Sequence, residues 1–138
     1  MSDKTFVDTN VLIYAYDVDA KAKHELAKIA LRELWSKRTG VLSMQVLQEF
    51  YVNATRKIPK PLPRNVAQSV VNSYSQWCVE TTPVEIAAAF RIEDEARIGF
   101  WDALIVAAAA KAGTVRILSE NLNARQSIAG ILIENPFV

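Results

Sequence analysis

The chain has 138 residues, of which 51% are hydrophobic and 22% charged, and its formal net charge is +1. This composition excludes an intrinsically disordered protein and is sufficient for one domain with a hydrophobic core, so we expect a single domain over residues 1–138. The single cysteine, Cys78, excludes an internal disulfide. The longest apolar run, residues 103–110, is too short to cross a bilayer. The sequence therefore predicts a cytoplasmic protein without a membrane partner.

The first patterned stretch is the β-forming run Thr5-Phe6-Val7, which ends at Asp8-Thr9-Asn10. A helix-like apolar run follows at residues 11–16. The carboxylate of Asp8 is therefore expected at the carboxyl end of a strand, which is where ligands bind in open parallel α/β sheets. The alternative is that Asp8 or Asn10 only caps the following helix, because Asp, Thr and Asn are all favourable N-cap residues.

Helices and short strands alternate along the rest of the chain. Apolar spacing and capping residues predict helices at residues 20–37, 44–57, 64–76, 82–98 and 103–112. Short strands are predicted at residues 41–43, 78–80, 114–119 and 131–133. Gly40 is placed to end the helix that precedes the second strand. This alternation predicts an α/β fold, in which helices cover both faces of a mainly parallel sheet.

Four acidic residues stand out by their positions in these elements. Asp8 ends the first strand, Glu49 flanks the buried face of the third helix, and Asp102 opens the most apolar helix. Glu120 ends a later strand, on the same sheet edge as Asp8 if the two strands are parallel. Simpler roles also fit, since Glu49 suits a solvated helix surface and Asp102 suits an N-cap.

Crowded carboxylates repel one another and resist ionisation unless a cation lies among them. Hard oxygen ligands favour Mg²⁺ or Mn²⁺ over zinc. A zinc site is disfavoured, because His24 and Cys78 are the only softer ligands and lack the spacing of a zinc motif. A metal-dependent phosphatase on a similar sheet is a further alternative, and the lack of a Gly-rich phosphate-binding loop argues against it.

Three segments resemble, in order, the acidic motifs of PIN-domain ribonucleases: residues 6–12 around Asp8, residues 43–50 around Glu49 and residues 100–109 around Asp102. The closest likeness is to the VapC-type toxins of toxin–antitoxin pairs. Leu118-Ser119-Glu120-Asn121-Leu122, together with Asn135-Pro136-Phe137, is similar to the C-terminal segment of that group. The resemblance covers the whole chain and implies one PIN-like nuclease domain, a three-layer α/β/α sandwich on a mainly parallel sheet.

The resemblance also implies a Mg²⁺ or Mn²⁺ site built from Asp8, Glu49 and Asp102. From its position at the end of a strand, Glu120 is a further candidate catalytic acid. The residues that it places in supporting positions are Thr9, Asn10, Ser119 and Asn121. The implied activity is metal-dependent hydrolysis of RNA phosphodiester bonds. The implied partners are RNA, a small antitoxin protein and a second copy of the chain.

The chain departs from the family pattern at Asn121, where the fourth motif usually carries an Asp. An amide still offers a neutral oxygen ligand but supplies no charge. Glu120 is the neighbouring acid that can take over part of this role. The alternative to an active ribonuclease is therefore a degenerate PIN domain that binds RNA or an antitoxin without cleaving.

Overall fold

The computed structural model describes residues 3–124 and 126–138 and contains a five-stranded sheet. Its strands are β1 (Thr5–Val7), β2 (Gly40–Val41), β3 (Arg116–Leu118), β4 (Ser127–Ile128) and β5 (Ile131–Glu134). The spatial order is β2-β1-β3-β5-β4. β1 pairs in parallel with β2 and with β3, and β3 pairs in parallel with β5. The β4–β5 pair is antiparallel, so the predicted mainly parallel sheet is confirmed.

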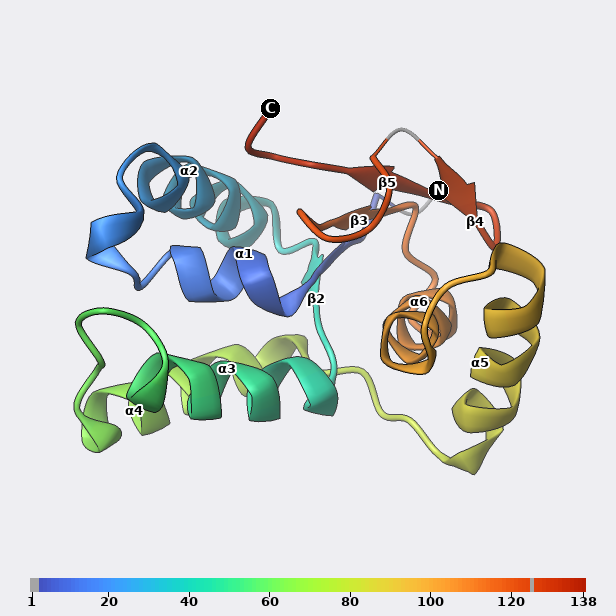
Figure 1. The fold of residues 1–138 in the computed structure, drawn as a ribbon, viewed down its shortest axis with the longest axis horizontal. Helices are drawn as coiled ribbons and strands as arrows, with labels where there is room; N and C mark the ends of the chain where they lie inside the picture. Colours follow the sequence, from blue (N-terminus) through green and yellow to red (C-terminus); the bar gives the residue numbers. More distant parts are fainter. Residues whose placement is uncertain (1–2, 125) are drawn as a thin grey trace.

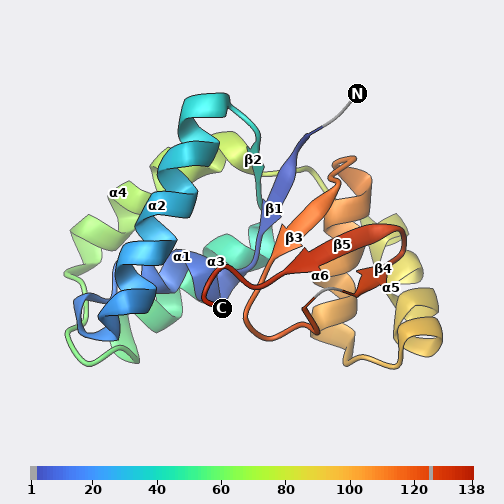
Figure 2. The same ribbon diagram turned by 90° about the horizontal axis from the view of Figure 1, so that it is seen from above.

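Helices flank this sheet in two groups. They are α1 (Thr9–Tyr14), α2 (Ala22–Lys37), α3 (Met44–Arg56), α4 (Arg64–Tyr74), α5 (Pro83–Ala96) and α6 (Phe100–Lys111), with the 3₁₀ turns η1 (Val18–Ala20) and η2 (Ser75–Trp77). Figure 1 shows α1 to α4 together on one side and α5 with α6 on the other. Seen from above in Figure 2, the strands run between these two groups. The predicted α/β fold is therefore confirmed.

The order of the strands creates an opening at one edge of the sheet. The chain passes from β1 to β2 on one side, and then returns to β3 on the other side of β1. Ligands bind at such a switch point, beyond the carboxyl ends of the strands. The backbone N–H of Asp8 donates to the carbonyl oxygen of Leu118 at 3.0 Å, so the ends of β1 and β3 lie together.

The core lies where both helix groups meet the sheet. Phe6 and Val7 of β1 are fully buried, because helices cover both faces of that strand. α6 buries residues 103 and 105–109, which explains why it is apolar on nearly every side. One side of α6 packs against α5. In the described residues, no helix has both the length and the apolar character needed to span a membrane.

Some expected element boundaries were wrong. The first helix begins at Thr9 rather than residue 11, because Asp8 takes the N-cap position. No strand forms at 78–80; Cys78 makes only an isolated bridge with Leu42. β4 was not predicted, since it has two residues and depends on a turn in which Ala129 and Gly130 both have positive φ.

Gly40 also has a different role from the one expected. Arg38, with φ 58°, is the left-handed residue that ends α2, whereas Gly40 lies in β2. A Cβ atom at Gly40 would lie 2.5 Å from a ring carbon of Trp77. Trp77 is held between Trp35 and Tyr74, with ring centroids 4.7 and 4.8 Å away, so the ring has no room to retreat. Glycine is therefore required for close packing.

Candidate active site

Asp8 is the centre of a buried hydrogen-bond network at the carboxyl end of β1. Its side chain is buried, and its Oδ1 accepts the backbone N–H of Thr9 at 2.8 Å. Its Oδ2 accepts the hydroxyl of Ser119 at 2.7 Å and the amide Nδ2 of Asn10 at 3.3 Å. The capping alternative is correct for Asp8, which is the N-cap of α1. In addition to capping the helix, Asp8 lines a cavity.

Ser119 and Asn10 hold the loop that follows β3 against the start of α1. The Ser119 Oγ accepts the backbone N–H groups of Asn121 at 3.1 Å and Leu122 at 3.3 Å. The Asn10 Oδ1 accepts the backbone N–H of Glu120 at 3.0 Å. These bonds fix the loop so that Asn121 lines the same cavity as Asp8.

Glu49 and Asp102 reach this cavity from two different helices. Glu49 lies on α3, and its Oε1 accepts the hydroxyl of Thr9 at 2.6 Å, which links it to the residue beside Asp8. Asp102 lies in the first turn of α6. The capping role considered for Asp102 is wrong, because Gly99 occupies the N-cap position.

The cavity has a volume of about 270 Å³ and is lined mainly by oxygen-bearing side chains. They are the carboxylates Asp8, Glu49 and Asp102, the hydroxyl of Thr9, and the amides Asn10, Gln45, Asn53 and Asn121. Of the residues expected in the site, the three acids and three of the four supporting residues, Thr9, Asn10 and Asn121, therefore line one cavity. The fourth, Ser119, is fully buried behind Asp8.

The acids in this cavity are electrostatically strained. Burial raises the pKa of Asp8 to about 6, against the lowering effect of its bonds to Ser119 and Thr9; the charges of Asp102 and Glu49 add to the rise. Burial, followed by the charge of Glu49, also raises the pKa of Asp102. Such a cluster favours uptake of a proton or a cation.

Glu120 is not brought to this cavity. Its carboxylate accepts the hydroxyl of Tyr14 at 2.8 Å and forms an ion pair with Lys23 at 2.6 Å. Burial acts to raise the pKa of Glu120, but the bonds from Lys23 and Tyr14 outweigh it and lower that pKa. Glu120 contributes its backbone N–H to the hydrogen-bond network around Asp8, where Asn10 accepts it. Its side chain points instead to Tyr14 of α1 and Lys23 of α2.

Three cavity residues were missed by the sequence analysis. Gln45 and Asn53 lie four residues before and after Glu49, and side chains at that spacing share one helix face. This four-residue spacing was the feature of the sequence that could have identified Gln45 and Asn53 as neighbours of Glu49. Trp101 precedes Asp102, and only the structure shows that it lines the cavity and is 65% exposed.

The donor set fits a hard divalent cation. Carboxylate and amide oxygens are the ligands that Mg²⁺ and Mn²⁺ prefer. In the described part of the chain, no group of three or more His, Cys, Asp or Glu side chains is arranged so that it could hold a metal ion by itself. Mg²⁺ in proteins usually binds one or two carboxylates and keeps several waters.

The comparisons with known proteins identify the family. The family model for the PIN domain matches residues 5–126. The chain belongs to the PIN domain family. The resemblance noted in the sequence is therefore confirmed at the level of the family. No curated protein matches the sequence.

Solved structures share this fold. A chain of the toxin–antitoxin complex from Klebsiella pneumoniae has a TM-score of 0.68 at 20% identity, with 97% of this chain and 98% of that chain covered. A chain of DNA-bound VapBC from Salmonella typhimurium has a TM-score of 0.65 at 23% identity, with coverage of 97% and 98%. Mycobacterium tuberculosis VapC20, a sarcin-ricin loop cleaving toxin, has a TM-score of 0.60 at 20% identity, with coverage of 83% and 87%.

The raised pKa of Asp8 predicts a specific pH dependence of stability. In the folded chain the pKa of Asp8 is about 6, above the ordinary value of 3.8, so protonated Asp8 favours the folded state. This contribution to the free energy of unfolding is complete below about pH 4 and is lost as the pH rises through 6. In EDTA, the free energy of unfolding of the wild type should fall by up to about 3 kcal/mol relative to Asp8→Asn across this range. Urea unfolding of both proteins at pH 4, 5, 6 and 7 measures this difference. Parallel pH profiles for the two proteins would contradict the electrostatic account.

Proposed function

We propose that this chain is a metal-dependent ribonuclease and the toxin of a type II toxin–antitoxin module, with one nuclease domain over residues 1–138. The observation that carries the proposal is the convergence of Asp8, Glu49 and Asp102 on one cavity at the switch point of the sheet. These residues come from β1, α3 and α6, so only the fold places them together. Membership of the PIN domain family supports the proposal.

The three acids and the two hydroxyl residues that hold them have distinct roles in this proposal. Asp8 and Asp102 would hold Mg²⁺ or Mn²⁺, and Glu49 would complete the ligand shell directly or through water. When bound, the ion lowers the pKa of a coordinated water and neutralises charge that develops on the phosphate. Ser119 fixes the orientation of the Asp8 carboxylate, and Thr9 fixes that of Glu49.

The lining of the cavity favours attack by water over a covalent enzyme intermediate. No Ser, Cys or His side chain lines the cavity among the residues that the structure describes. Thr9 has a hydroxyl there, which donates to Glu49 at 2.6 Å, and we assign it to positioning that side chain.

The proposed partners are RNA, a small antitoxin protein and a second copy of the chain, in the cytoplasm. The antitoxin is supported by the structures of the same fold, which are described as toxin–antitoxin complexes from Klebsiella pneumoniae and Salmonella typhimurium. RNA as substrate is supported by the Mycobacterium tuberculosis toxin that cleaves the sarcin-ricin loop.

The alternative is a degenerate PIN domain that binds RNA or an antitoxin without cleaving. One observation favours it: Asn121 takes the place of an acid at the cavity, and the Glu120 carboxylate is bound to Lys23 and Tyr14 instead of replacing it. The charge of the site then rests on Asp8, Glu49 and Asp102.

Cleavage of RNA tests the proposed function. Purified protein incubated with total RNA should cleave it with Mg²⁺ or Mn²⁺ and should not cleave it in EDTA, and the mapped ends would show the sequence at the cut. Asp8→Asn should abolish cleavage, because it removes a metal-binding charge. Asp94→Asn is a matched control, since Asp94 is exposed on α5, and it should cleave like the wild type. Soluble, folded wild type that leaves RNA intact with both metals would support the degenerate alternative.

The Asn121 position gives a second prediction. Asn121→Asp adds a carboxylate to the cavity with almost no change in size, so it should raise Mg²⁺ affinity by roughly tenfold. Glu120→Gln should change Mg²⁺ affinity little, because the Glu120 carboxylate is bound to Lys23 and Tyr14. Calorimetric titration of both variants with Mg²⁺ measures the two effects. A large loss of affinity in Glu120→Gln would show that Glu120 is the working fourth acid.

A further inference from the structure

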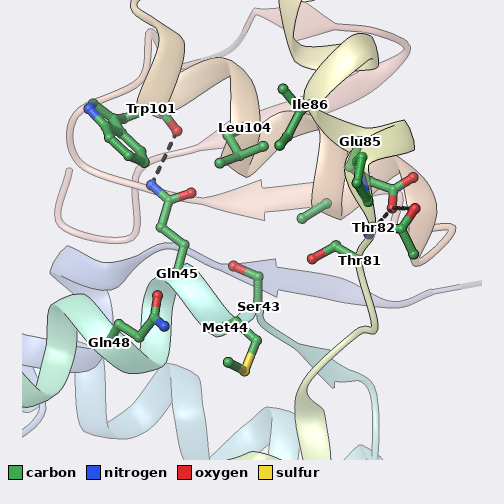
Figure 3. Close-up of a pocket in the computed structure, with 12 residues that line it drawn as sticks. Ser43, Met44, Gln45, Gln48, Thr81, Thr82, Glu85, Ile86, Trp101 and Leu104 are labelled. Carbon is green, nitrogen blue, oxygen red and sulfur yellow. Dashed lines mark hydrogen bonds between the residues drawn. The ribbon is translucent and has the colours of Figure 1, made fainter.

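A second cavity, of about 350 Å³, adjoins the acid-lined one. Gln45 and Trp101 line both cavities and therefore form the wall between them. Figure 3 shows the Gln45 side chain of α3 reaching the backbone carbonyl oxygen of Trp101 in α6, with Leu104 and Ile86 farther along the space. Hydroxyl groups of Ser43 and Thr82 also line this second cavity.

Trp101 has an unusual environment for a tryptophan. It is 65% exposed, whereas Trp77 is only 8% exposed and packs in an aromatic cluster with Trp35. Phe100 packs edge-on against the Trp101 ring, with centroids 5.3 Å apart and an interplanar angle of 71°. A large aromatic ring is thus presented to solvent directly beside the carboxylate of Asp102. Flat aromatic or heteroaromatic ligands stack on rings that are presented in this way.

Gln45 adds unused hydrogen-bonding capacity to the same wall. Its Nε2 donates to the backbone carbonyl of Trp101 at 3.3 Å. Its Oε1 is the one buried side-chain nitrogen or oxygen without a hydrogen-bond partner in the described part of the chain. A buried acceptor without a donor is costly, so a ligand that brings an N–H group to it is favoured. The oxygen is covered, and a small rotation of the amide is needed for a ligand to reach it.

We propose that the second cavity binds an unpaired nucleobase of the RNA strand whose phosphate lies at the acid-lined cavity. Trp101 stacks on the face of the base, and the Gln45 amide bonds to its edge. A nucleobase has both features that the wall requires, a flat π-face and N–H donors beside acceptors. This inference rests on the proposed ribonuclease function and adds to it a subsite for one unpaired base, because the face of a base is free to stack on protein only outside a duplex.

The shared wall distinguishes a nucleotide from a purely apolar occupant. The acids Asp8, Glu49 and Asp102 line only the first cavity. The second has a larger apolar share, from Ile86, Leu104 and Ala108, beside polar side chains that include Gln48 and Glu85. A nucleotide has the same division between its charged phosphate and its flat base. A protein partner that covered only Trp101 would make no contact with the acids of the adjoining cavity.

Tryptophan fluorescence in EDTA tests this proposal without cleavage. The probes are single-stranded RNA hexamers of each of the four bases and an abasic hexamer with the same phosphates. The base-bearing hexamers should quench the emission and the abasic one should not. Trp101→Phe should lose the quenching but keep affinity within roughly threefold, since phenylalanine also stacks. Trp101→Ala should weaken binding by roughly ten- to a hundredfold.

Ile29→Ala is the matched control, because Ile29 is 58% exposed on α2 and lines neither cavity. It should bind the hexamers like the wild type. Gln45→Met, which keeps the length but removes the amide, should reduce the preference among the four bases. Equal binding of the abasic and base-bearing hexamers, or wild-type affinity in Trp101→Ala, would overturn the proposal.

Three further outcomes separate this proposal from a protein interface and from the proposed function. If Trp101→Ala binds RNA normally but dissociates a dimer in sedimentation, the surface is a protein interface and the base site is overturned. If the wild type cleaves RNA and Trp101→Ala binds and cleaves equally well, the base site fails while the ribonuclease function stands. If base-dependent quenching occurs in a protein that never cleaves, the base site stands and the ribonuclease function fails.

Discussion

The hydrogen bond from the Ser119 hydroxyl to the Asp8 carboxylate is the interaction on which the rest of the site depends. It joins the carboxyl ends of β1 and β3, at 2.7 Å, where the strand order changes direction. The same hydroxyl accepts two backbone N–H groups of the following loop, and that loop carries Asn121 to the cavity. One buried serine therefore orients an acid, shapes a loop and closes one wall of the proposed active site.

This arrangement leaves the carboxylates poorly stabilised in the folded chain. Asp8 accepts three hydrogen bonds, yet its pKa stays near 6, because burial and the neighbouring charges of Asp102 and Glu49 outweigh them. Acids whose pKa is raised by burial and by neighbouring charges cluster at functional sites. A divalent cation would relieve the repulsion and, by binding only the folded chain, would stabilise it. In the proposed ribonuclease, stability and activity would therefore be linked through the same three side chains.

The sequence predicted features that depend on local chemistry. The first strand, the acid at its end and the helix predicted at residues 82–98 follow from residues that are close in the chain; in the structure, Thr82 and Glu85 form a capping box at the start of that helix. The two-residue strand β4 was missed, because its pairing depends on an Ala-Gly turn with no strong sequence signal. In the sequence, Glu120 looked equivalent to the other acids. In the structure, the direction of its side chain is set by bonds to Lys23 and Tyr14, which lie far away in the chain. Trp101 precedes the helix predicted at residues 103–112, and only the fold shows that it lies in the first turn of α6, exposed at the cavity that Asp102 also lines.

The central claim is that Asp8, Glu49 and Asp102 together bind a divalent metal ion. Anomalous diffraction from crystals grown with Mn²⁺ measures the position of such an ion without reference to activity. The account predicts an anomalous peak within ligand distance, about 2 Å, of a carboxylate oxygen of Asp8, in the cavity that Asp102 and Glu49 also line. A cavity without a peak at saturating Mn²⁺, or a peak only at other acids, would contradict it.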